Sequence, residues 1–249
     1  DLGPVSIQLA TSSLDEDWAE PLRRYLAREA PRFSPWHLII SQDGELPSNM
    51  PFEYQRVALR FCADPAQRTA WVYVGTEKPD LMAAVELLLT FAVFELGGIC
   101  VHASAAVVDG KGLLMPGPSG TGKSTSVKYG GFEKVVGDER IILIPENGDW
   151  MMYSTPFWSK GRSITPTSEN QKLSSILMLK KGQMIRISAL TQLDVLRCLM
   201  RNAVHYGAVE GQANSIFERC AQISVHCDGH ELMFTKKGPW AWRLNQMLT

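Results

Sequence analysis

The sequence predicts a mixed α/β fold in which several strands follow one another directly along the chain. Short apolar runs bounded by Gly, Pro, Asp or Asn recur throughout, which is typical of strands. Pro79–Leu96 is long and apolar and ends at Gly97-Gly98, as a helix does. Asp109-Gly110 separates two apolar runs as a tight turn, which a strict βαβ alternation would not contain.

Composition and charge exclude several classes of protein. The chain has 249 residues, of which 45% are apolar and 20% charged, so it is long enough and apolar enough to bury a core. Lys and Arg number 25 against 26 Asp and Glu, which leaves no basic surplus for nucleic acid or an acidic membrane. No secretory signal is visible, and five scattered cysteines without a CxxC pair predict reduced thiols. We therefore expect a cytoplasmic protein that binds neither nucleic acid nor membrane.

The N-terminal third predicts an accessory α+β region that is rich in strands. We place its boundary at residues 77 and 78, so that an accessory region 1–77 precedes a catalytic core 78–249. Apolar residues recur at every fourth position in Leu14–Ala27, which predicts a helix. Three β-type runs follow it: Trp36–Ser41, Val57–Cys62 and Ala70–Val74.

The remainder of the chain predicts strands first and then alternating helices and strands. The expected strands are Ile99–Val101, Ala105–Val108, Gly112–Met115, Lys134–Asp138, Arg140–Ile144, Trp150–Ser154 and Leu173–Leu179. The expected helices are Lys123–Tyr129, Gln192–Val204, Ala213–Cys220 and a last one after Pro239. Between the last two, we expect a hairpin of Ile223–His226 and Glu231–Thr235 around Asp228-Gly229.

Residues 117–124 read GPSGTGKS and match GxxxxGK[ST], the phosphate-binding P-loop. Its glycines let consecutive backbone N–H groups converge on phosphate oxygens. Lys123 would contact the β- and γ-phosphates, and the hydroxyl of Ser124 would bind Mg²⁺. A predicted strand precedes the loop and a predicted helix follows it, as the motif requires. We expect ATP and Mg²⁺ to bind, with the nucleotide held by Gly117, Pro118, Ser119, Gly120, Thr121, Gly122, Lys123, Ser124 and Thr125.

An acidic pair, Asp138-Glu139, follows the loop after one short helix and one strand. A carboxylate in this position could hold Mg²⁺ or accept the proton of an attacking hydroxyl. We assign Asp138 as a catalytic base and, with Ser124 and Glu139, as a candidate metal ligand. The alternative is a solvated acidic turn between two strands.

Four further residues have both a functional and a structural interpretation. His102 precedes the strand pair that leads into the loop and could orient Asp138, although a lone histidine is more often structural. Lys160 and Arg162 could clamp a transferring phosphate or be solvated loop cations. Trp158 could cover the nucleotide or line a peptide groove, or it could simply pack against its neighbours.

Residues 101–144, from VHASAAVVDG through the loop to VVGDERIILI, resemble the catalytic domain of HPr kinase/phosphorylase. The divergent HPr kinase-related branch, some members of which accompany peptide-modifying clusters, is the more similar one. The resemblance implies a P-loop kinase core related to phosphoenolpyruvate carboxykinase, with a mixed sheet and an N-terminal β-rich extension. It also implies that Asp138 is the general base, that His102 supports it, and that Lys123 and Ser124 act on phosphate and Mg²⁺.

The sequence departs from this family at three points. Glu139 replaces the second aspartate of the acidic pair, and Thr125 stands where the bifunctional enzymes carry glutamate. Residues 155–162 contain no carboxylate, whereas the bifunctional enzymes have an acidic-arginine-glycine signature there. The resemblance therefore gives no basis for a phosphorylase reaction or for HPr itself as the substrate.

We expect an ATP-dependent kinase that phosphorylates a hydroxyl, most simply a serine of a small protein or of a ribosomally made precursor peptide. Two alternatives stay open: a nucleotide-gated peptide-binding module without transfer activity, and a kinase for a small metabolite. The sequence also leaves open whether the donor is ATP, GTP or pyrophosphate, and whether the protein forms a homo-oligomer.

Overall fold

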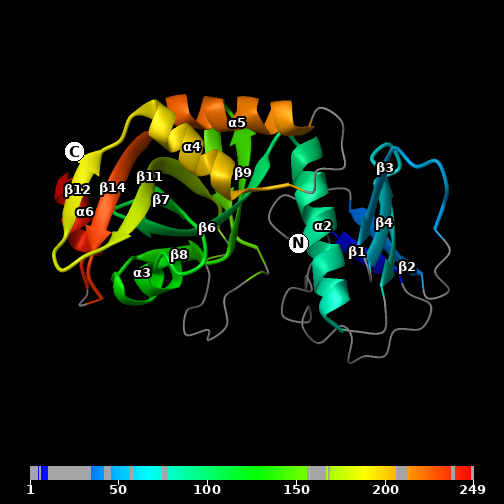
Figure 1. The fold of residues 1–249 in the computed structure, drawn as a ribbon, viewed down its shortest axis with the longest axis horizontal. Helices are drawn as coiled ribbons and strands as arrows, with labels where there is room; N and C mark the ends of the chain where they lie inside the picture. The colour runs from blue at the N-terminus through cyan, green and yellow to red at the C-terminus, as the bar shows by residue number, and fades with distance from the viewer. Residues whose placement is uncertain are drawn as a thin grey trace. The chain divides into compact units, whose positions relative to one another are not determined.

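The computed structural model divides the chain into two compact units (Figure 1). It describes residues 5, 7–10, 35–41, 46–56, 59–74, 78–155, 157, 167, 169–205, 212–236 and 239–247. The first unit contains Asp1–Leu96 and His205–Gln212, and the second contains Gly97–Val204 and Ala213–Thr249. The helix after residue 77 thus groups with the N-terminal strands, whereas we expected it to begin the catalytic core. Both units combine helices with mixed sheets, which confirms the α/β class.

The N-terminal unit contains a five-stranded sheet of order β1-β2-β5-β4-β3. Strands β1, β2 and β5 are parallel, and β4 and β3 continue the sheet in antiparallel fashion. The expected strand Trp36–Ser41 is confirmed to the residue, while the polar strand Phe52–Arg56 was not expected. The strands are β1 Ile7–Ala10, β2 Trp36–Ser41, β3 Phe52–Arg56, β4 Leu59–Asp64 and β5 Thr69–Val74.

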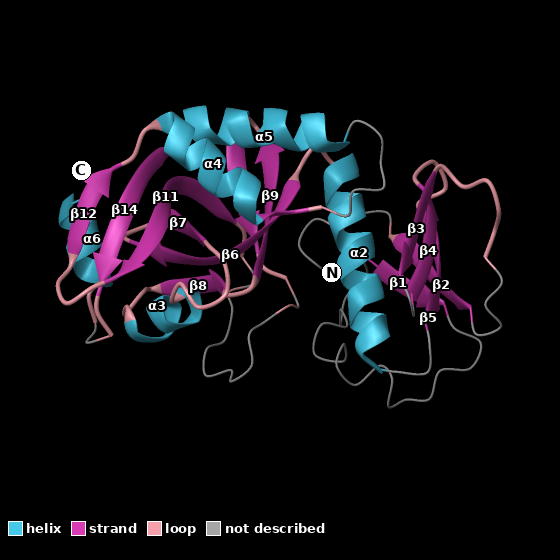
Figure 2. Cartoon of the chain, viewed as in Figure 1, coloured by secondary structure: helices cyan, strands magenta, loops and turns pink. Residues whose placement is uncertain are grey.

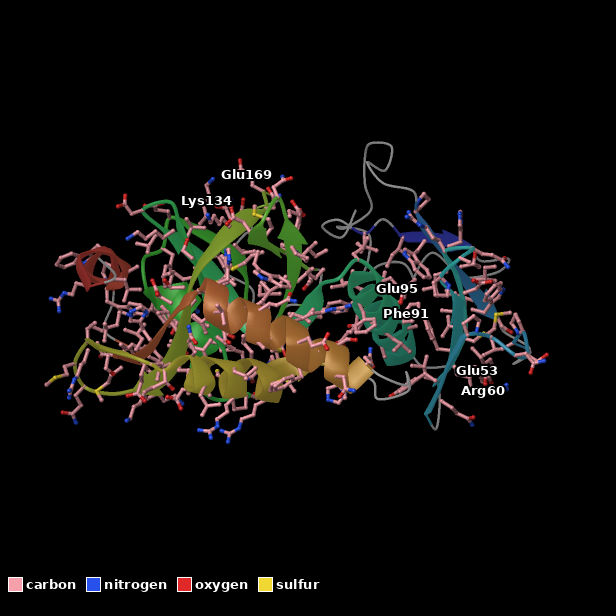
Figure 3. All side chains as sticks on the ribbon, turned by 90° about the horizontal axis from the view of Figure 1, so that it is seen from above. Glu53, Arg60, Phe91, Glu95, Lys134 and Glu169 are labelled. Carbon is pink, nitrogen blue, oxygen red and sulfur yellow. The ribbon has the colours of Figure 1, made fainter. Side chains whose placement is uncertain are left out.

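The long helix α2, Lys78–Glu95, confirms the expected apolar helix and packs against β4 and β5. Its residues from Ala84 to Val93 are mostly buried. Phe91, labelled in Figure 3, meets the ring of Trp36 edge to face at a centroid distance of 5.6 Å. The expected helix Leu14–Ala27 lies outside the described residues.

The C-terminal unit contains a nine-stranded sheet whose main path is β10-β9-β6-β7-β11-β14-β12, with β8 and β13 also paired to β6. Strands β7, β11 and β14 are parallel to one another, and most other neighbours are antiparallel. The strands are β6 Ile99–Val108, β7 Lys111–Pro116, β8 Lys134–Gly137, β9 Arg140–Glu146, β10 Asp149–Tyr153, β11 Gln171–Lys181, β12 Arg186–Ala189, β13 Ala203–Val204 and β14 Asp228–Phe234.

Helices cover both faces of this sheet (Figure 2). One face carries α3 and α6, and the other carries α4 and α5. On the first face, Val127 of α3 and Trp240, Ala241 and Leu244 around α6 join Leu113, Met115 and Phe234 of the sheet in one buried apolar cluster. The helices are α3 Lys123–Tyr129, α4 Gln192–Asn202, α5 Gln212–His226 and α6 Ala241–Met247.

Two expectations about the elements of this unit are wrong. Ile99–Val101 and Ala105–Val108 are parts of one continuous strand, β6, which runs through His102. Ile223–His226 is not the first strand of a hairpin but the last turn of α5. Ile216, Cys220 and Ile223 are all buried and recur at helical spacing, so the buried face of α5 extends to its β-branched residue Ile223. Asp228-Gly229, the expected turn, begins β14.

The expected reduced thiols are confirmed, because all five cysteines are free and buried.

Among the described helices, none has the length and apolar character needed to span a membrane. An exposed ion pair joins the start of β8 to the segment before β11: Lys134 Nζ lies 2.5 Å from Glu169 Oε2, and both residues are labelled in Figure 3.

Strand β10 pairs with β11 as well as with β9, and β11 also pairs with β7. Gly112 of β7 lies where these strands meet. A methyl group at its Cα would overlap the carbonyl oxygen of Lys172 and lie 2.6 Å from Cε of Met152. Only a glycine fits there without a shift of the β11 backbone.

The substitution Gly112→Ala should therefore lower the free energy of unfolding by about 1–3 kcal/mol, as overpacking typically does. Urea unfolding followed by circular dichroism measures the change. Ser188→Ala on the exposed strand β12 is the control and should stay within about 0.5 kcal/mol of the parent. An unchanged midpoint for Gly112→Ala would show that β7 and β11 are not packed this closely.

Candidate functional site

The P-loop motif, residues 117–124, leaves the sheet beside the middle of β6. Pro116, the last residue of β7, pairs with Ala103 of β6. The next residue, Gly117, donates its backbone N–H to the carbonyl oxygen of His102 at 3.3 Å. Strand β6 therefore fixes where the loop begins, and His102 lies on the strand next to its first residue.

The acidic pair reaches the same place from the other edge of β6. Gly137, at the end of β8, pairs with Ala105, and Arg140, at the start of β9, pairs with His102. Asp138 and Glu139 thus occupy the short break between two strands that run in the same direction along β6. As expected, one helix and one strand separate the loop from the pair, and both motifs meet at the midpoint of one strand.

Two glycines give the loop its shape. Gly120 and Gly122 have φ values of +87° and +106°, in the left-handed region that other residues avoid, and they flank Thr121, which does not. Alternation of this kind turns successive N–H groups toward a common point, where an anion can bind. The hydroxyl of Thr121 donates to the carbonyl oxygen of Pro118 at 2.9 Å and closes the loop.

Lys123 lies beneath the loop and is only 5% exposed. Its ammonium donates to the carbonyl oxygens of Gly117 at 2.6 Å and Pro118 at 3.1 Å. Burial lowers the pKa of Lys123, while the charges of Glu139 and Asp138 raise it and that of Arg140 lowers it. The lysine and both carboxylates therefore share one electrostatic environment.

The imidazole of His102 contacts the second carboxylate of the acidic pair, Glu139. Its Nε2 lies 3.2 Å from Oε1 of Glu139, and Arg140 Nη1 lies 3.4 Å from the same oxygen. The hydrogen bond from His102 lowers the pKa of Glu139; the charges of His102, Arg140 and Lys123 act in the same direction, and partial burial opposes them. Glu139 is therefore held as a carboxylate. That His102 orients Asp138 stays a prediction.

The two carboxylates of the acidic pair differ in exposure. The side chain of Glu139 is 34% exposed, whereas Asp138 is only 7% exposed. Among the described residues, Glu139 lines the cavity over the loop and Asp138 does not. Thr155 is also buried in this region, and its hydroxyl donates to the carbonyl oxygen of Arg140 at 2.8 Å.

A cavity of about 560 Å³ lies over the loop, large enough for a nucleotide. It is bounded by the carboxyl ends of the parallel strands β7, β11 and β14, the edge at which α/β sheets bind ligands. Its wall contains expected residues of the loop and the acidic pair: Ser119, Gly120, Gly122, Lys123, Ser124, Thr125 and Glu139.

The rest of the lining was missed by the sequence analysis and consists of Lys181, Gly182, Phe234, Thr235 and Lys236. The sequence shows a lysine at or just beyond the end of each of two apolar strands. This pattern indicates a shared site only once β11 is known to be parallel to both β7 and β14. Lys160, Arg162 and Trp158, which we considered for a phosphate clamp and a nucleotide cover, lie outside the described residues.

The donor set at the cavity fits Mg²⁺. Ser124 and Glu139 both line it and offer a hydroxyl and an ionised carboxylate, the hard oxygen ligands that Mg²⁺ prefers. No cluster of three His, Cys, Asp or Glu side chains with metal-binding geometry occurs among the described residues. Mg²⁺ at nucleotide sites typically uses only one or two protein ligands and completes its shell with phosphate and water.

Comparison with protein families finds one match over most of the chain. The family described as "SynChlorMet cassette protein ScmC" matches residues 79–226, which is more than half of the sequence and includes the loop, His102 and the acidic pair. The chain therefore belongs to the ScmC family. No curated protein matches it.

Replacing His102 by alanine should raise the pKa of Glu139 toward its ordinary value of 4.5. Because the folded-state pKa lies below the unfolded one, Glu139 stabilises the fold above pH 4.5 and loses this contribution as the pH falls through the lowered value. The variant should therefore show a smaller loss of stability in that pH window. NMR titration of the side-chain carboxyl carbons measures the pKa directly.

The matched control is His226→Ala, since His226 Nε2 lies 3.3 Å from Asp149 Oδ1 in a separate ion pair. It should leave the pKa of Glu139 unchanged. Equal titration curves for Glu139 in the parent and in His102→Ala would contradict the pairing of His102 with Glu139.

Proposed function

We propose that this member of the ScmC family is an ATP-dependent kinase that transfers the γ-phosphate to a hydroxyl group. The observation that supports it most is the convergence on the middle of β6 of a P-loop from one edge and an acidic pair from the other. Phosphoryl transfer needs a cradle for the polyphosphate and a carboxylate near its terminal phosphorus. Neither motif alone would suggest a transferase.

In this proposal the loop and Lys123 bind the polyphosphate. The N–H groups around Gly120 and Gly122 face the phosphate oxygens, and the ammonium of Lys123 moves from the carbonyl oxygens of Gly117 and Pro118 to the β- and γ-phosphates. Its burial makes this contact strong, because a charge in a poorly hydrated site interacts more strongly with an anion. Ser124 and Glu139 would hold Mg²⁺, which neutralises charge on the phosphates when bound.

Asp138 is the proposed base for the acceptor. The acceptor oxygen forms a bond to the γ-phosphorus, and the bond from that phosphorus to the β–γ bridging oxygen breaks. The hydroxyl proton passes to the carboxylate of Asp138, and the electron pair leaves with the nucleoside diphosphate. His102 acts indirectly, since its hydrogen bond keeps Glu139 ionised beside the base.

The resemblance of residues 101–144 to HPr kinases supports a serine as the acceptor, in a small protein or a precursor peptide. The family description names its members as cassette proteins, which supports testing the products of neighbouring genes as acceptors. The cytoplasm, where ATP is available, is the proposed location.

Replacing Lys123 by alanine should weaken ATP binding by about 10- to 100-fold, because charge-assisted contacts to phosphate are each worth about 1.5–3 kcal/mol. Isothermal titration calorimetry with Mg²⁺ and ATP measures it. Lys128→Ala, an exposed lysine on the same short helix, is the control and should bind as the parent does. Absence of ATP binding by the parent protein would reject the proposed function.

Replacing Asp138 by asparagine should lower the rate of phosphate transfer by about 10²-fold or more and leave ATP affinity within a factor of about three. Glu139→Gln should instead raise the Mg²⁺ concentration needed for half-maximal transfer, since it removes a proposed ligand. Transfer of labelled phosphate from ATP to the neighbouring gene products gives both rates. Full activity of Asp138→Asn would refute its role as the base. ATP binding with no transfer to any acceptor would favour a nucleotide-gated binding module.

A further inference from the structure

Two lysines line the part of the cavity that is farthest along the sheet from the acidic pair. Lys181 ends β11 and Lys236 lies two residues beyond the end of β14, and both are exposed. Within the described part of the chain, no ion pair is recorded for either lysine. The adjacent Lys180 differs, because its Nζ lies 3.4 Å from Oε1 of Glu231.

The wall that carries these lysines is fixed to the phosphate-binding loop. Lys181 pairs with Phe234 in the parallel ladder of β11 and β14, and Gly182 donates its N–H to the carbonyl oxygen of Phe234 at 2.9 Å. The ring of Phe234 in turn lies against Gly122, where a Cβ atom would be 2.5 Å from its Cζ. The backbone positions of both lysines are therefore set relative to the loop.

The order of the strands gives the cavity a direction. The acidic pair lies at the start of β9, the loop follows β7, and the two lysines follow β11 and β14, in the order β9-β6-β7-β11-β14. With about 4.8 Å between neighbouring strands, the ends of β11 and β14 lie roughly 5 and 10 Å beyond the loop, on the side away from the acidic pair. With the terminal phosphate beside the acidic pair and the next phosphate on the loop, a nucleoside triphosphate places its α-phosphate on the β11 side of the loop, within reach of extended lysine side chains. Inorganic pyrophosphate bound in the same way ends at the loop.

We infer that Lys181 and Lys236 form a subsite for the nucleoside side of the donor, where they bind the α-phosphate and favour a nucleoside triphosphate over inorganic pyrophosphate. The inference rests on the proposed function, which assigns the terminal phosphate to the acidic side of the loop. The same cations would then offset the negative charge of the departing nucleoside diphosphate, since the γ-phosphoryl group leaves at the opposite end.

The test compares binding of two probes, ATP and inorganic pyrophosphate, each with Mg²⁺, to the parent, the double variant Lys181→Ala/Lys236→Ala and the control Lys180→Ala. The parent should prefer ATP. The double variant should lose about 10- to 100-fold in ATP affinity and less than threefold in pyrophosphate affinity, because two charge-assisted contacts reach only the longer ligand. Lys180→Ala should bind both probes as the parent does.

Each result gives a clear answer. Parent-like ATP affinity in the double variant would overturn the subsite while leaving the proposed function intact. An equal loss for both probes would also overturn it, because it would show general attraction of anions rather than selection by length. If the parent binds pyrophosphate but not ATP, both the subsite and the assignment of ATP as donor fail. Thermal unfolding of the double variant, expected to match the parent, confirms that the fold is retained.

Discussion

The hydrogen bonding of β6 along both of its edges is the constraint on which the candidate site depends. On one edge β7 ends opposite Ala103, and on the other β8 ends opposite Ala105 and β9 starts opposite His102. Backbone groups within these strands are paired with β6, and both segments leave the sheet where that pairing ends. The loop and the acidic pair are thereby brought together by main-chain geometry, and their side chains need only supply the chemistry.

Electrostatics within the site follow from this arrangement. Burial lowers the pKa of Lys123, and the negative charges of Glu139 and Asp138 offset part of this effect. The two acidic residues have different environments: Asp138 is buried, whereas Glu139 lines the cavity and its lowered pKa keeps it ionised. Such a division suits one carboxylate to proton transfer and the other to a cation.

Local sequence signals predicted much of the fold and half of the site. The P-loop, α3, β2 and the strand before Asp138 follow from glycine positions and apolar runs that act over a few residues. Ile223–His226 was mistaken for a strand because its β-branched residues have strand propensity, whereas burial of Ile216, Cys220 and Ile223 keeps it helical. Lys181 and Lys236 could not be found from the sequence, because their nearness to the loop depends on the parallel pairing of strands more than 50 residues apart. The partner of His102 likewise depends on the register of β6 and β9.

The contact between Gly122 and Phe234 restricts which residues can replace either of them. A residue with any side chain at position 122 would require both a different backbone conformation and a smaller neighbour at position 234. Over evolution, the glycine can change only if the aromatic ring changes with it, so the two should vary jointly among relatives or not at all. The residue at the end of β14 is therefore constrained together with the loop.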